Sequence, residues 1–361
     1  MTKRVYNFYP GPATLPLPAL KRAQAELLDF NGTGMSVLEI SHRSEEWEQA
    51  IEEATGLVRE LMHVPSDYTI MWLQGGASTQ FLMTPINLQI PGKTMEYINT
   101  GGWSTKAIKE AKLYGDVKII ASSEEDNFNH IPKEYAIGKD AAYLHITSNN
   151  TLYGTEWHEW PEPPDNVPLV CDMSSDLMAR DVDIKKFGVI YGGAQKNLGP
   201  AGVTLVIVRN DLLDRVPEKT PTMLKWKTQA AKGSMFNTPS VFAIYISKLC
   251  LEYWKEYGGI SKIEKTNREK AKILYDVIDQ SDGFYRGHAI KDSRSLMNVT
   301  FTLANKDLES QVVEEGTRHD LIGLGGHRSV GGMRASIYNA MSVKGVKALA
   351  EFLTEFREEH Q

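Results

Sequence analysis

A single lysine lies in a glycine-rich turn that follows a short apolar run. Residues 189–202 read VIYGGAQKNLGPAG, so Lys196 has small neighbours and flexible backbone on both sides. A lysine that condenses with an aldehyde needs a site packed closely enough to lower its pKa and open enough to admit the aldehyde. Taken alone, this segment is more typical of a solvated loop lysine, so other segments must decide between the two interpretations.

A carboxylate ends another apolar run upstream. The run LVCD at 169–172 places Asp172 at the end of a predicted strand, twenty-four residues before Lys196. Strand ends in open α/β sheets face the ligand crevice. An ionised aspartate there can pair with a pyridinium nitrogen and keep it protonated, which makes the ring an electron sink. The alternative is that Asp172 caps the following helix through its side chain.

Two further segments could hold the rest of such a cofactor. Residues 72–79 read WLQGGAST, a strand followed by glycines and a helix start, with backbone amides and two hydroxyls that could bind a phosphate. Trp103 follows Gly101 and Gly102 and could stack on a ring, although in isolation it is more typical of a core aromatic. The joint match to a pyridoxal phosphate site outweighs each separate alternative.

Other nucleotide and metal motifs are incomplete. Gly92-Lys93-Thr94 resembles the end of a phosphate loop, but Asn87 stands where the first glycine is needed. The glycine turn at 323–325 fails the dinucleotide pattern because Arg328 replaces its third glycine. The chain has no His-Glu-x-x-His and no Cys-x-x-Cys, so we expect no metal site.

Most of the chain reads as alternating strands and helices. Ser44 is a plausible N-cap, and apolar residues then recur every three or four positions to Leu61, which predicts an amphipathic helix. A further helix is expected at 104–114. Continuous apolar runs predict strands covered on both faces of a mostly parallel sheet. These runs lie at 69–73, 94–98, 117–121, 142–146, 169–171, 189–191 and 203–208.

The pattern changes near Gly283. Before it, Pro239 begins one expected helix, and a second helix rich in Lys and Glu follows. After it we expect strand, strand-like turn, helix, a glycine-rich loop at 323–332, strand and a final helix. This segment is predicted to be a smaller α/β domain.

Length and charge limit the classes of function. A chain of 361 residues suggests two domains around a large core. Forty basic and forty-six acidic side chains give a net charge of −6, which disfavours nucleic-acid binding. The sequence has no run of about twenty apolar residues that would predict a membrane span, and we expect a cytoplasmic protein. Cys171 and Cys250 are expected to be reduced and packed.

With these residues in hand, the chain resembles the phosphoserine aminotransferases, a family of class V, fold-type I pyridoxal phosphate enzymes similar in architecture to aspartate aminotransferase. The resemblance covers almost the whole chain. Its motifs are NFYPGPA at 7–13, SHRS at 41–44, QGGA at 74–77, AQKNLGP at 194–200, NTP at 237–239 and GHR at 326–328.

The resemblance implies a fold and a set of cofactor contacts. The fold is that of the PLP-dependent transferases, with an arm at 1–15, a large domain at 16–258 holding a mostly parallel seven-stranded sheet, and a small α/β domain at 259–361. Lys196 would form the Schiff base with pyridoxal 5'-phosphate, and Asp172 would pair with the pyridinium. The cofactor would also contact Ala77, Ser78, Trp103, Thr151 and Gln195, and, from the partner in a homodimer, Asn237 and Thr238.

Substrate residues follow from charge and from the resemblance. Glutamate and 3-phosphohydroxypyruvate are both multiply anionic, and Arg suits carboxylate and phosphate through bidentate contacts. By resemblance, Arg334 would bind the α-carboxylate. The distal carboxylate or phosphate would meet His42, Arg43, His327 and Arg328, some from the partner subunit. For any single Arg the alternative is a surface ion pair, and for either His an interior hydrogen-bonding residue.

The implied reaction is a ping-pong transamination in serine biosynthesis that yields O-phosphoserine and 2-oxoglutarate, and relatives also act on a phosphorylated hydroxythreonine precursor of vitamin B6. Alternatives on the same fold are a serine-glyoxylate-type aminotransferase and a cysteine desulfurase. The desulfurase needs a mobile thiol, which neither cysteine offers. A nicotinamide-dependent oxidoreductase and a non-catalytic dimeric scaffold are the remaining alternatives.

Overall fold

The centre of the molecule is a seven-stranded sheet. The computed structural model describes residues 4–327 and 330–361. The strands run in the order β2–β10–β9–β8–β5–β3–β4, and only β10 is antiparallel to its neighbours. Their bounds are β2 (Tyr68–Leu73), β3 (Met95–Asn99), β4 (Val117–Ser122), β5 (Tyr143–Thr147), β8 (Leu169–Asp172), β9 (Val189–Gly193) and β10 (Thr204–Arg209). All seven expected strands are therefore confirmed in one sheet.

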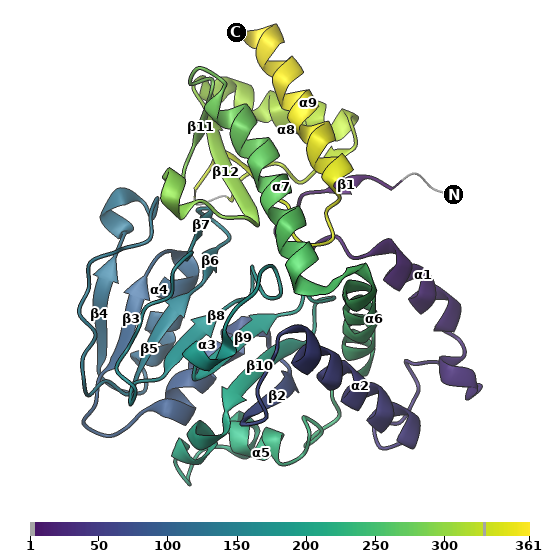
Figure 1. Cartoon of the computed structure of the whole chain (residues 1–361), viewed down its shortest axis with the longest axis vertical. Coiled ribbons are helices and arrows are strands. Elements are labelled where there is room, and N and C mark those ends of the chain that lie inside the picture. The colour runs from purple at the N-terminus through teal and green to yellow at the C-terminus, as the bar shows by residue number, and fades with distance from the viewer. Residues whose placement is uncertain (1–3, 328–329) are drawn as a thin grey trace.

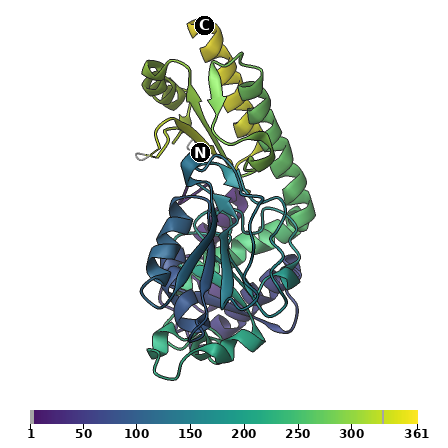
Figure 2. The same ribbon diagram turned by 90° about the vertical axis from the view of Figure 1, so that its left-hand side faces the viewer.

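Helices cover both faces of this sheet (Figure 2), so its inner strands are almost wholly buried, whereas the edge strand β4 is partly exposed. The helices of this part are α1 (Leu17–Glu26), α2 (Glu45–Leu61), α3 (Gly76–Leu88), α4 (Gly102–Ala111), α5 (Trp226–Ala230) and α6 (Val241–Tyr257). One apolar core holds residues of α2 and α6, and a second holds residues of α3 and α4. The expected Ser44 cap is confirmed, because its hydroxyl accepts the Trp47 N–H at 3.3 Å.

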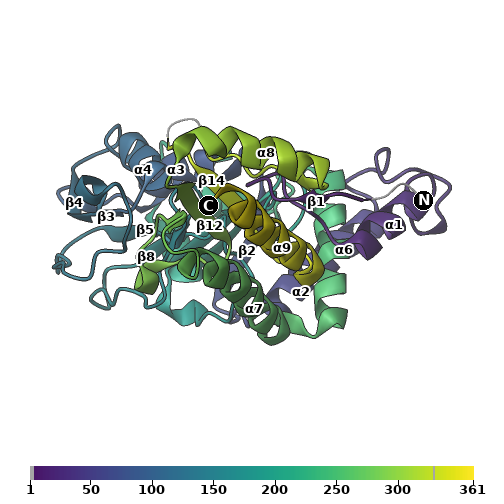
Figure 3. The same ribbon diagram turned by 90° about the horizontal axis from the view of Figure 1, so that it is seen from above.

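A smaller antiparallel sheet and three helices form the rest (Figure 1). The strands β11 (Tyr285–Gly287), β12 (Asn298–Leu303) and β14 (Met333–Ser336) pair in that order. The helices are α7 (Gly259–Asp279), α8 (Glu309–Arg318) and α9 (Val343–His360), and Figure 3 shows α9 between the other two. Among the described helices, none has the length and apolar character needed to cross a membrane.

Helix α7 joins the two parts. It begins after Gly258, whose φ of +118° breaks the chain direction from α6. Its first turns pack Ile260 and Ile263 into the large core, whereas Ala271 and Leu274 enter the small one. We propose that the large domain spans 16–258 and the small domain spans 259–361, and that α7 is the element that both cores share.

The N-terminal arm crosses to the small domain. Strand β1 (Tyr6–Asn7) pairs in parallel with β13 (Leu321–Ile322), and Phe8 is buried in the small core. Further along, the N–H of Ala13 donates to the carbonyl oxygen of Gln195 at 2.9 Å. The arm therefore touches both the small domain and the turn that holds Lys196. A short hairpin, β6 (Asn149–Asn150) and β7 (Thr155–Glu156), lies on the way between β5 and β8.

Candidate active site

Six of the predicted residues line one cavity of about 130 Å³. They follow the carboxyl ends of parallel strands, because β2, β3, β8 and β9 all point toward the same edge of the sheet. The six are Ala77, Ser78, Trp103, Asp172, Gln195 and Lys196. The sheet therefore gathers segments that are more than a hundred residues apart in the sequence.

Lys196 is buried within a small hydroxyl cluster and is only 8% exposed. Its Nζ donates to Thr151 Oγ1 at 2.7 Å and to Ser175 Oγ at 2.8 Å, and these two hydroxyls lie 2.6 Å apart. Burial lowers the pKa of Lys196 to about 8, the Asp172 charge opposes this shift, and the Arg334 charge adds to it. The amine can therefore lose its proton near neutral pH, as a nucleophile or a general base must.

Asp172 is buried and held by its neighbour Ser174. The backbone N–H and the hydroxyl of Ser174 both donate to Asp172 Oδ1, at 2.9 and 2.6 Å. Burial raises the pKa of Asp172, and the Ser174 hydrogen bonds oppose this shift. Both of these hydrogen bonds go to Oδ1, and Asp172 lines the cavity. A protonated ring nitrogen there would supply the opposite charge that this carboxylate needs.

The turn before α3 exposes backbone amides to the cavity. Gly75 has a φ of +89°, and a Cβ there would lie 1.9 Å from Thr79 Oγ1, so a side chain is excluded. Helix α3 then begins with Gly76, Ala77 and Ser78 on the cavity wall. A helix N-terminus with free N–H groups and a hydroxyl attracts an anion such as phosphate.

Trp103 supplies the flat surface. It lies in the first turn of α4, and the centroid of its ring is 5.6 Å from Lys196 Nζ. The Trp103 Nε1–H is buried without a hydrogen-bond partner. An amine, an acid, an anion cradle, a ring surface and an orphaned donor therefore border one space. This donor set fits a phosphorylated pyridine aldehyde.

Arg334 brings a buried cation next to this cavity. It is 5% exposed, and its NH1 donates to the backbone oxygen of Thr151 at 3.2 Å. Because the Thr151 hydroxyl accepts from Lys196, the guanidinium and the amine share one neighbour. A substrate carboxylate bound by Arg334 would therefore lie within reach of the amine.

The remaining predicted residues lie outside the Lys196 cavity of the single chain. Asn237 lines a second cavity beside Gln74, whose amide donates to the Thr238 oxygen at 3.0 Å. His42 and Arg43 lie just before α2 and are half-buried and exposed, respectively. His327 is exposed, and Arg328 lies outside the described residues.

Three polar contacts of the site were not predicted from the sequence. Ser174 and Ser175 hold Asp172 and Lys196, and the Asn197 amide donates to the Ser175 oxygen at 2.9 Å. The two consecutive serines that follow Met173, just beyond the strand that ends in Asp172, are the signal that could have found them.

Known proteins match this chain over almost its whole length. Residues 5–349 match the family described as Aminotransferase class-V. The phosphoserine aminotransferase of Desulfosudis oleivorans is 54% identical over 99% of this chain and 99% of that protein. The structure of phosphoserine aminotransferase from Bacillus circulans subsp. alkalophilus superposes with a TM-score of 0.98, at 47% identity and full coverage of both chains. The PLP-bound phosphoserine aminotransferase of Trichomonas vaginalis superposes with a TM-score of 0.92, at 36% identity, over 97% of this chain and 100% of that one.

The charges around Lys196 predict how its pKa responds to substitution. Asp172→Asn removes the negative charge that favours the ammonium form, so the pKa of Lys196 should fall below about 8. Arg334→Gln removes a repelling positive charge, so this pKa should rise. Competitive acetylation of the ligand-free protein across pH, read by mass spectrometry, measures both shifts. Equal titration curves for Lys196 in the three proteins would contradict this electrostatic description.

Proposed function

The chain belongs to the class-V aminotransferase family, and from this premise we propose that its Lys196 cavity binds pyridoxal phosphate and transfers the amino group of L-glutamate to 3-phosphohydroxypyruvate. The products are 2-oxoglutarate and O-phospho-L-serine, so the reaction is a transamination of serine biosynthesis. The observation that carries this proposal is the position of Lys196, which shares one cavity with Asp172, Trp103 and the N-terminus of α3.

The cofactor contacts follow from the donor set. Lys196 would bond to the aldehyde carbon, Asp172 to the ring nitrogen, and Ala77 and Ser78 to the phosphate. Gln195 lines the same cavity, and the Thr151 hydroxyl lies beside the amine, where it can meet the ring hydroxyl. Bound there, pyridoxal phosphate supplies an electron-withdrawing ring that makes the α-proton of an amino acid acidic.

The chain's own residues then move the proton. Once the incoming amine has taken its place, Lys196 would carry the proton from the substrate Cα to the aldehyde carbon in the first half-reaction, and from that carbon to the Cα of the second substrate in the other. The hydroxyls of Thr151 and Ser175 orient Nζ for this transfer. Arg334 fixes the α-carboxylate and so the position of Cα. The first product leaves before the second substrate enters, and the amino group stays with the enzyme between the two half-reactions.

The two cysteines argue against a desulfurase. Cys171 is fully buried in the large core on β8, and burial raises its pKa well above the usual range. Cys250 lies within α6, and burial raises its pKa to about 12. Neither thiol can serve as a nucleophilic thiolate at neutral pH. Two free, buried cysteines also suit a reducing compartment, which supports our proposal of a cytoplasmic enzyme.

We further propose a homodimer with shared active sites. Asn237 and Thr238 do not line the Lys196 cavity of their own chain, so they remain for the cofactor of a partner. Apolar side chains are exposed near them and near α2, as expected for a surface that another subunit covers. These side chains are Leu28, Met35, Leu38, Met223 and Phe236.

The central prediction concerns Lys196. The purified wild-type protein should absorb visible light through its bound cofactor, and glutamate should bleach that band. Lys196→Ala removes both the covalent attachment and the base, so kcat should fall by about 10⁴ or more. Lys185→Ala alters an exposed lysine of the short 3₁₀ helix Ile184–Lys186; this variant is the matched control and should keep wild-type activity. A colourless wild type, or an active Lys196→Ala enzyme, would refute the proposed function.

The second prediction concerns the phosphate of the keto acid. A charge-assisted hydrogen bond contributes about 1.5–3 kcal/mol. Hydroxypyruvate has no phosphate, so each such bond that it lacks should lower the kcat/KM for hydroxypyruvate roughly 10- to 150-fold below the value for phosphohydroxypyruvate. Arg43→Ala should narrow this ratio, if Arg43 reaches the phosphate. Steady-state kinetics with both keto acids measure the ratio, and the phosphorylated hydroxythreonine precursor can be compared as a third substrate. A preference for the unphosphorylated acid would contradict the anionic pocket.

The third prediction tests the shared site. Mixed and re-assembled subunits, one kind with Lys196→Ala and the other with Asn237→Ala and Thr238→Val, form hybrid dimers that contain one intact site. Random assembly should restore about a quarter of wild-type activity from two poorly active parents. A mixture that only averages its parents, or a monomer by light scattering, would show that each chain builds its site alone.

A further inference from the structure

A second lysine is buried and forms no ion pair with a described acid. Lys270 lies in the middle of α7 and is 0% exposed. Its Nζ donates to the backbone oxygens of Ile337 at 2.8 Å, Tyr338 at 2.7 Å and Met341 at 3.1 Å, and the Asn339 oxygen lies at 3.5 Å. We call residues 337–341, which connect β14 to α9, the junction loop.

The carbonyl oxygens of the junction loop replace water around the amine. Among the ion pairs between described residues, none includes Lys270, so carbonyl dipoles are its partners. Burial lowers the pKa of Lys270 to about 7, while an ammonium group offers three N–H bonds to these oxygens. Without the amine, the Ile337 and Met341 oxygens would lose this donor, while the Tyr338 oxygen would keep the Met341 N–H at 2.9 Å. Each buried carbonyl that loses its donor destabilises the loop conformation.

The junction loop connects two groups that the transamination needs. Arg334 lies on β14, three residues before the loop begins. In the middle of the loop, the N–H of Asn339 donates to Asn197 Oδ1 at 2.9 Å, and Asn197 directly follows Lys196. The Asn339 side chain is fixed in turn, because the amide of Asn267 on α7 donates to its Oδ1 at 2.8 Å.

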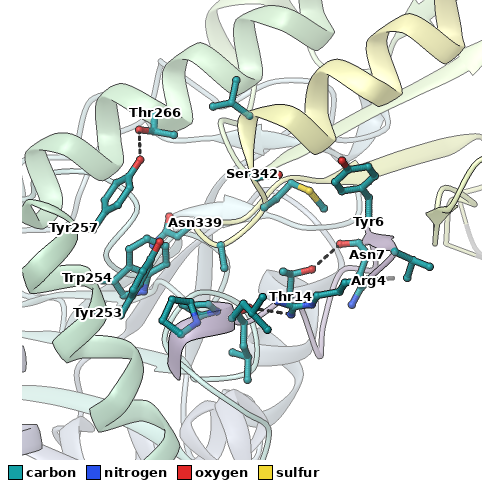
Figure 4. A pocket seen from close by; sticks show the side chains of 18 residues that line it. Arg4, Tyr6, Asn7, Thr14, Tyr253, Trp254, Tyr257, Thr266, Asn339 and Ser342 are labelled. Carbon is teal, nitrogen blue, oxygen red and sulfur yellow. Dashed lines mark hydrogen bonds between the residues drawn. The ribbon is translucent and has the colours of Figure 1, made fainter. Parts of the chain in front are cut away.

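Side-chain packing does not hold the loop on every side. Residues 339–343 also line a cavity of about 380 Å³. Figure 4 shows this cavity with Tyr253, Trp254 and Tyr257 of α6 on one side and the N-terminal arm on the other. Ile337, Tyr338 and Met341 pack into the small core, but the cavity borders 339–343 on another side, so the hydrogen bonds from α7 add to the constraint that packing supplies.

We propose that Lys270 is a positioning residue for the reaction, fixing the junction loop and thereby the spacing between Arg334 and Lys196. The inference rests on the proposed function for the roles of those two residues. Loosening the loop should shift Arg334 relative to the amine. Glutamate binding then weakens, while the cofactor contacts, which come from other elements, remain.

The first test compares two lysines of the same helix. Lys270→Met keeps an unbranched side chain and removes the N–H donors, whereas Lys272→Met alters an exposed lysine two residues later that pairs with Asp276. In the holoenzyme, Lys270→Met should raise the KM for glutamate about tenfold, the effect of removing roughly one hydrogen bond to a charged group. It should leave the visible cofactor band unchanged, and Lys272→Met should match the wild type. A purely structural role would lower the melting temperature without raising KM.

A second readout does not depend on activity. Amide hydrogen exchange of the holoenzyme, followed in the peptide that covers 333–341, should be faster in Lys270→Met than in Lys272→Met. If Lys270→Met does not fold, Asn197→Ala removes the acceptor of the Asn339 N–H and should produce the same rise in KM and the same faster exchange. The inference would be overturned if the variant that folds showed the same KM for glutamate and the same rate of hydrogen exchange as the wild type.

Chemical rescue separates the N–H donors from the positive charge. Lys270→Ala leaves room beside the loop carbonyls, so methylammonium should lower its KM for glutamate toward the wild-type value, and tetramethylammonium, which has no N–H, should not. Rescue by neither or by both would overturn the role of the N–H donors. A wild type without transamination rejects the proposed function itself, whereas an active wild type with an unaffected Lys270→Met rejects only this inference.

Discussion

The structure depends on keeping one amine out of water and still able to exchange a proton. Lys196 is buried, and burial favours its neutral form, while the charge of Asp172 favours the ammonium. Neither burial nor the charge of Asp172 alone can set the protonation state of Lys196. An amine with an ordinary pKa would be a permanent ammonium, and an amine without any opposing charge could not hold a proton between steps. The hydroxyls of Thr151 and Ser175 serve both protonation states, because each can donate or accept.

This balance explains the architecture around it. Six parallel strands end at one edge of the sheet, so short turns after each strand can present an acid, an amine and a helix N-terminus to one cavity. Rigid strands fix the large-domain half of the site. The small-domain half, which carries Arg334, is attached through the junction loop and α7. The relative position of the two halves thus rests on α7, which packs into both cores, and on hydrogen bonds such as that from the Asn339 N–H to Asn197.

Local patterns predicted much of this arrangement. The seven strands were found because doubly covered strands are continuously apolar, and Lys196, Asp172 and the QGGA turn were found because they follow such strands. Properties that depend on contacts between distant parts of the chain were not predicted. The reversed direction of β10, the two-residue strand β1 and the fully buried Lys270 depend on partners far along the chain. Lys270 lies in a helix rich in Lys and Glu, where composition predicts a solvated surface.

The crossing of the arm to the opposite domain has a consequence for biogenesis. Tyr6 pairs with Leu321, and the Ser336 N–H donates to the Phe8 oxygen, so the arm must wait for partners that lie more than three hundred residues later in the chain. Until then the large sheet can form, but the turn at Gln195 lacks the neighbour that Ala13 provides. The large core can therefore form early in folding, whereas the arm and the small domain complete the surroundings of Lys196 later.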